Sequence, residues 1–101
     1  MPRVLVIEDE KGARHVLGSA LSRDGNEVQT VAQLDRAVDV ARDFQPEVIV
    51  ADWLFPEGTV LAVAQELRST FPSAVMIFMS GLPLNCFEGD AERFDPVAIL
   101  Q

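Results

Sequence analysis

Residues 3–10 read Arg-Val-Leu-Val-Ile-Glu-Asp-Glu, an apolar, β-branched run that ends directly in three acids. A continuous apolar run of this length is typical of a strand buried on both faces, as in a parallel sheet. Further strands are predicted at residues 27–32, 48–51 and 74–79. Helical spacing of apolar residues separates the strands, over residues 12–24, 34–45 and 57–71. This alternation predicts an α/β fold, a parallel sheet with helices on both faces.

The pattern weakens in the C-terminal part of the chain. Pro83, Asn85 and Gly89 stand where a fourth helix is due, so we expect that helix to be short or missing. Residues 91–94 predict a very short fifth strand, and residues 96–101 predict the first turns of a last helix with Pro at its first position. We therefore expect one domain, residues 1–101, whose last helix is truncated.

Composition excludes several classes of protein. The 101 residues are 49% hydrophobic and 24% charged, which fits one globular domain. The single cysteine, Cys86, cannot form an internal disulfide, and no apolar run approaches the ~20 residues of a membrane helix. A formal net charge of −8 argues against direct binding of nucleic acid, because phosphate contacts need a basic face. With no signal peptide apparent, these features predict a cytoplasmic protein that does not bind membranes.

Polar side chains follow three of the predicted strands directly. They are Glu8 and Asp9 after the first, Asp52 after the third and Ser80 after the fourth. Ligands of doubly wound sheets bind beyond the carboxyl ends of the strands. Carboxylates gathered there repel one another, a repulsion that Mg²⁺ would offset, and a carboxylate can act as a nucleophile toward a phosphoryl group. The alternative is that each acid only caps a helix, but three strand ends presenting suitable groups at one edge favour a phosphorylation site at Asp52.

The sequence resembles the receiver domain of two-component response regulators. The matching segments are residues 4–10, 46–52, 56–58 and 79–81, and the match is strong over residues 1–81. The resemblance implies a flavodoxin-like (CheY-like) doubly wound parallel sheet of five strands with flanking helices. It also implies Asp52 as the phosphoacceptor and Mg²⁺ bound by Asp9, Asp52, Glu8 through water and the backbone carbonyl of Leu54. Ser80 takes the position of the switch hydroxyl.

The sequence departs from the family's pattern near its C-terminus. The family places a phosphate-contacting lysine and a proline after the fifth strand, where Asp95-Pro96 is the best counterpart here, and Lys11 is the only lysine. Glu92 aligns with the family's aromatic switch residue, and Phe94 lies two residues later. The loop after Asp52 is also about two residues shorter than usual.

The sequence is compatible with three functions, and we favour the first. The leading hypothesis is a receiver domain in phosphorelay signalling that accepts a phosphoryl group on Asp52 from a sensor histidine kinase or a histidine phosphotransfer protein. The alternative is a pseudo-receiver, an interaction domain that does not depend on phosphorylation. An enzyme is disfavoured, because His15 is distant in the predicted fold and Leu54 stands where a second acid would be needed. A homodimer stays open.

Overall fold

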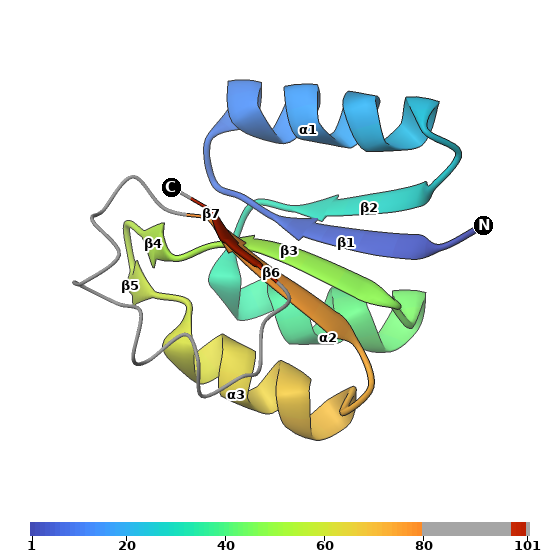
Figure 1. Ribbon diagram of the computed structural model, residues 1–101. Helices are drawn as coiled ribbons and strands as arrows, with labels where there is room; N and C mark the ends of the chain where they lie inside the picture. The colour runs from blue at the N-terminus through green and yellow to red at the C-terminus, as the bar shows by residue number, and fades with distance from the viewer. Residues whose placement is uncertain (80–97, 101) are drawn as a thin grey trace.

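Five parallel strands form the sheet at the centre of the molecule. A computed structural model describes residues 1–79 and 98–100 of the chain. The strand order is β2-β1-β3-β6-β7, as Figure 1 shows. The strands are β1 (Arg3–Ile7), β2 (Glu27–Val31), β3 (Val48–Asp52), β6 (Val75–Met79) and β7 (Ala98–Leu100). Every neighbouring pair is parallel. This order confirms the predicted flavodoxin-like, five-stranded sheet.

Helices cover both faces of the sheet. The helix α1 (Lys11–Arg23) lies on one face, and α2 (Leu34–Phe44) and α3 (Leu61–Thr70) lie on the other (Figure 1). No helix in the described part of the chain is long and apolar enough to cross a membrane. The predicted short or missing fourth helix falls in residues 80–97 and lies outside the described residues.

The core has two layers because both faces of the central strands are apolar. In β1, Leu5 and Ile7 pack toward α2 and α3, whereas Val4 and Val6 pack with Leu17 under α1. All four of these β1 side chains are at most 4% exposed. Burial on both faces explains why β1 is a continuous apolar run rather than an alternating one.

A small hairpin replaces part of the third predicted helix. The strands β4 (Leu54–Phe55) and β5 (Gly58–Thr59) pair in antiparallel fashion, and α3 begins only at Leu61. Gly58 adopts a φ of 132°, a conformation that residues with a Cβ rarely adopt. The hairpin was not predicted, because two-residue strands show no periodicity in a sequence.

The prediction of a helix over residues 96–101 is wrong, since the fifth strand of the sheet occupies Ala98–Leu100. Each of its three residues is registered with β6, from Ile77 with Ala98 to Met79 with Leu100. One turn of helix would leave its own backbone groups without partners, whereas pairing with β6 satisfies them along the ladder. The shorter strand predicted at residues 91–94 lies outside the described residues.

Candidate metal and phosphorylation site

Three carboxylates meet at the carboxyl-terminal edge of the sheet. Glu8 and Asp9 follow β1, and Asp52 is the last residue of β3. One carboxylate oxygen from each of the three lies within 4.8 Å of the others. Glu8 is only 6% exposed, whereas Asp9 and Asp52 are half-buried. The structure therefore brings together the three acids that the sequence singled out.

The strand register explains this meeting. Ile7 of β1 pairs with Ala51 of β3, so the next residue on each strand, Glu8 and Asp52, falls at the same level of the sheet. Backbone hydrogen bonds hold both positions: the Glu8 N–H donates to the Val31 carbonyl (3.0 Å), and the Trp53 N–H donates to the Met79 carbonyl (2.8 Å). The acids are thus positioned by the rigid part of the fold.

Glu8 lies in an electrostatically unfavourable place. Burial, a hydrogen bond to Asp52 and the negative charges of Asp52, Asp9 and Glu10 together raise the pKa of Glu8 to about 7, with burial the largest cause. Its Oε2 atom is buried and has no hydrogen-bond partner among the described residues. A buried carboxylate oxygen without a partner is costly, and a bound cation or a hydrogen-bond donor would lower that cost.

The capping alternative applies to a different acid. Glu10 is the N-cap of α1, and its carboxylate accepts hydrogen bonds from the backbone N–H groups of Gly12 (3.1 Å) and Ala13. These bonds lower the pKa of Glu10. No cap hydrogen bond to Glu8 or Asp9 is present in the described structure, so helix capping does not explain these two acids.

Arg14 holds the backbone of the acidic segment, a contact that the sequence did not reveal. Its Nη1 atom donates to the carbonyl oxygens of Glu8 (3.1 Å) and Asp9 (3.2 Å). The guanidinium therefore links the first turns of α1 to the residues that carry the two carboxylates. In the sequence, the only sign of this contact is a basic residue five positions after Asp9. A basic residue at that position is equally typical of a solvent-exposed helix face.

The aromatic residues after Asp52 form the floor of this region. Trp53 and Phe55 are 2% and 4% exposed, and the Trp53 ring packs edge-on against Phe78 with centroids 5.3 Å apart. They therefore belong to the core and do not form an exposed anchor for a partner. Leu54, expected to offer its carbonyl to the metal, lies in β4 and is registered with Thr59. Its role as a ligand stays a prediction.

The remaining predicted site residues fall at or beyond the end of the described region. Ser80 follows β6 directly and lies outside the described residues. Asp95 was expected immediately after the fifth strand, at the position of the family's lysine. This placement is wrong, because the fifth strand begins at Ala98 and the residue that follows it is Gln101. The same strand overturns the alignment of Glu92 with the aromatic switch position.

The acidic cluster fits a divalent metal ion. Mg²⁺ prefers carboxylate oxygens and binds through one or two of them together with water. The cluster offers three carboxylates, and the buried Oε2 of Glu8 lacks a partner. In the described part of the structure no basic side chain forms an ion pair with any of the three acids. The donor set therefore suits a hard cation.

Comparisons with known sequences agree with this geometry. Residues 4–84 match the sequence model of the response regulator receiver domain. The KDP operon transcriptional regulatory protein KdpE of Escherichia coli is 29% identical over 99% of this chain and 40% of its own length. The transcriptional regulatory protein AfsQ1 of Streptomyces coelicolor is 33% identical over 69% of this chain and 31% of its own length. The chain thus spans less than half the length of these curated relatives.

Solved structures share the fold. The response regulator TrrA of Thermotoga maritima, solved in complex with Mg²⁺–BeF, superimposes with a TM-score of 0.84 at 23% identity, covering 99% of this chain and 85% of that chain. The chemotaxis protein CheY4 of Vibrio cholerae gives a TM-score of 0.90 at 20% identity with the same coverage.

Proposed function

The chain belongs to the response regulator receiver domain family, and from this membership and its acidic edge we propose that it accepts a phosphoryl group on Asp52. The donor is the phosphohistidine of a sensor histidine kinase or of a histidine phosphotransfer protein. The observation that carries the proposal is the meeting of Glu8, Asp9 and Asp52 within 4.8 Å at the ends of two neighbouring strands.

The proposed transfer needs an accessible carboxylate beside a charge-neutralising site. Asp52 is half-buried, so one of its oxygens can reach the phosphorus atom of a docked phosphohistidine. An O–P bond forms, the N–P bond breaks, and its electron pair stays on the imidazole nitrogen, which later takes up a proton from water. Asp9, Asp52 and the Leu54 carbonyl would hold Mg²⁺, with Glu8 acting through a bound water. When bound, the ion neutralises the charge that develops on the phosphoryl oxygens.

Ser80 supplies the second half of the proposed switch. It follows Met79, whose carbonyl accepts the hydrogen bond from the Trp53 N–H next to Asp52. A hydroxyl there would donate to an oxygen of the new phosphoryl group and bias the domain toward an active conformation. Since Asp95 does not follow the fifth strand, its charge gives no support to the pseudo-receiver alternative. The expected loss of the fourth helix, another ground for that alternative, lies outside the described residues.

We assign the chain no catalytic turnover of its own. His15 is exposed on α1 and faces a groove between α1 and β2, and no carboxylate stands at Leu54 to act as an acid or base.

A cytoplasmic location and a homodimer stay predictions. KdpE and AfsQ1 are named as transcriptional regulators, so a longer protein containing this domain would bind DNA through residues other than these, whose net charge is −8.

The test is phosphorylation by acetyl phosphate in the presence of Mg²⁺. We expect a hydroxylamine-labile acyl phosphate in the wild-type chain, detected by intact-mass spectrometry. Asp52→Asn should abolish it, whereas Asp35→Asn, which neutralises an exposed acid on α2, should leave it unchanged. Beryllofluoride with Mg²⁺ should also shift the amide resonances around Asp52. Absence of both the acyl phosphate and the amide shifts would overturn the proposal.

A further inference from the structure

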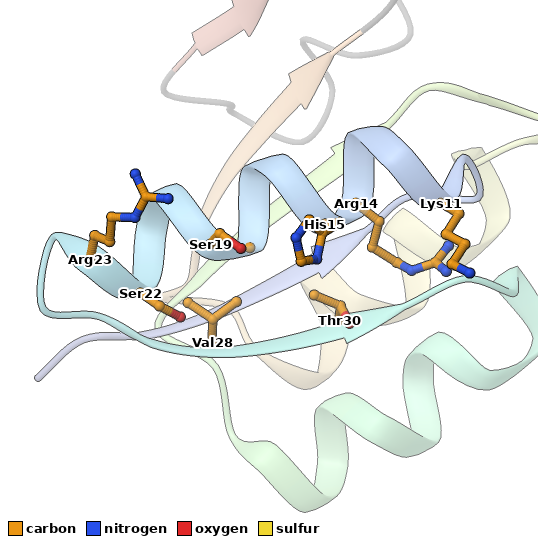
Figure 2. Close-up of a pocket in the computed structure, with 9 residues that line it drawn as sticks. Lys11, Arg14, His15, Ser19, Ser22, Arg23, Val28 and Thr30 are labelled. Atoms are coloured by element: carbon orange, nitrogen blue, oxygen red, sulfur yellow. The ribbon is translucent and has the colours of Figure 1, made fainter.

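A groove of about 590 Å³ runs along α1, outside the cluster of carboxylates. One wall is a stripe of α1 residues and the other is formed by Val28 and Thr30 of β2 (Figure 2). Lys11, Arg14 and His15 line the same end of the groove. Because residues three and four apart share one face of a helix, these three nitrogen-bearing side chains lie next to one another.

The basic groups of this groove form no ion pair within the described structure, although the charge of Arg14 helps to lower the pKa of the neighbouring Glu10. Lys11, Arg14 and Arg23 form no ion pair there, although the chain has 16 acids and only 8 Lys and Arg residues. Arg14 uses Nη1 for the carbonyls of Glu8 and Asp9, and its guanidinium carries further N–H donors. A concentration of unpaired positive charge is unusual on a protein of net charge −8.

Hydroxyl donors and an apolar surface complete the groove. Ser19, Ser22 and Thr30 line the groove together with Val28 (Figure 2). From Lys11 to Arg23 the helix rises by roughly 18 Å, at about 1.5 Å per residue. The volume of the groove lies within the range of about 300–1,000 Å³ that is typical of small-molecule sites.

We propose that this groove binds a small molecule bearing a phosphate or pyrophosphate group, held between Lys11, Arg14 and His15 at one end. Guanidinium, ammonium and imidazole N–H groups together match the several oxygens of a phosphate better than those of a single carboxylate. Val28 and the hydroxyl groups provide a surface for the remainder of the ligand, and Arg23 provides a second cation at the far end.

The net negative charge of the protein favours a small anionic ligand over a large polyanion. At physiological salt, charges are screened beyond about 8 Å, so a small anion in the groove interacts mainly with the local cations. A nucleic acid or an anionic membrane would extend over the acidic remainder of the surface and be repelled. The groove therefore suits a phosphorylated metabolite rather than a polyanionic macromolecule.

Titration calorimetry with inorganic pyrophosphate, ATP and citrate tests the proposal. The measurements use Asp52→Asn protein in EDTA, so that phosphate groups cannot bind through the acidic cluster. We expect saturable binding of pyrophosphate or ATP and weaker binding of citrate, which distinguishes phosphate from carboxylate recognition. If only ATP binds, the nucleoside is part of the ligand. Amide resonances of Lys11, His15 and Thr30 should shift.

Matched variants separate a built site from general electrostatics. Lys11→Gln and His15→Gln should each weaken binding by about tenfold, equivalent to about 1.4 kcal/mol. Arg36→Gln removes the same charge as Lys11→Gln from an exposed position on α2, and it should change the affinity by less than about twofold. The proposal is overturned if none of the probes binds saturably, if Arg36→Gln weakens binding as much as Lys11→Gln does, or if citrate binds as tightly as pyrophosphate.

Discussion

At the scale of single residues, Glu8 shows how a functional requirement opposes stability. Its carboxyl is buried beside two other acids, and its unpartnered Oε2 gains nothing from the fold in the absence of a cation. The strand β1, which ends just before Glu8, buries only apolar side chains. A buried, unpartnered charge of this kind is typical of a functional site, where a bound ligand stabilises it.

Glu8 predicts a pH dependence of stability in EDTA. Because the pKa of Glu8 is about 7 in the folded state and near its ordinary value of 4.5 when unfolded, the folded state binds the proton more tightly. The free energy of unfolding should therefore fall as the pH rises from about 4.5 to about 7, by about 1–3 kcal/mol, and be level above this range. Urea unfolding at a series of pH values measures it.

A neutral isostere provides the control for this titration. Glu8→Gln cannot ionise, so its stability curve should lack that fall and should lie above the wild-type curve at pH 8. Glu57→Gln changes an exposed acid in the hairpin turn and should retain the wild-type slope. Parallel curves for the wild type and Glu8→Gln would contradict the electrostatic account of Glu8.

At the scale of elements, two glycines make opposite demands on the backbone. Gly18 lies within α1, and a Cβ there would contact Thr30 Cγ2 at 3.4 Å, an ordinary distance. Gly58 has a φ of 132° in the hairpin, with open space where a Cβ would lie. The first glycine therefore has only a helix-propensity cost, and the second is required by its conformation.

Alanine substitutions should separate these two roles. Gly18→Ala should raise the free energy of unfolding by about 0.5–1 kcal/mol, since alanine favours the helix and its Cβ would meet Thr30 Cγ2 at an ordinary contact distance. Gly58→Ala should lower it by about 1–3 kcal/mol, because the residue would be held in a conformation that is costly for any side chain. Thermal unfolding of both variants measures the changes, and effects of the same sign would refute the assignment.

The elements also show what the sequence could predict. Three of the five sheet strands, β1, β3 and β6, were predicted from apolar runs, which are the compositional signal of strands in the middle of a parallel sheet. The edge strand β2 was predicted too, although most of its residues are exposed. The last strand, Ala98–Leu100, is too short to show a period and follows a proline that equally suits a helix start. Its pairing with β6 is a long-range contact, which local patterns do not encode.

At the scale of the whole molecule, the acidic cluster was predictable and its support was not. Glu8, Asp9 and Asp52 each follow an apolar run, so the rule that ligands bind at the carboxyl ends of parallel strands was enough to group them. Arg14 holds the first two residues through their backbone carbonyls, and a backbone contact of this kind depends on the helix position rather than on a motif. The basic groove likewise appears only once α1 is laid beside β2.

The cluster joins parts of the chain that are distant in sequence, so a metal ion bound there should stabilise the whole fold. The unfolded chain does not hold Glu8, Asp9 and Asp52 together, and Mg²⁺ therefore binds the folded state preferentially. At a free concentration ten times the dissociation constant, the gain in the free energy of unfolding is about 1.4 kcal/mol. Urea unfolding in Mg²⁺ and in EDTA measures this difference.

Asp52→Asn should reverse the order of stabilities between the two conditions. In EDTA the variant should be at least as stable as the wild type, because one of three mutually repelling charges is removed. In Mg²⁺ the wild type should gain stability and the variant should gain much less, since a metal ligand is lost. Asp35→Asn should respond to Mg²⁺ as the wild type does. An equal response of Asp52→Asn and the wild type would show that the ion binds elsewhere, and the acidic edge would then have to be explained without a metal.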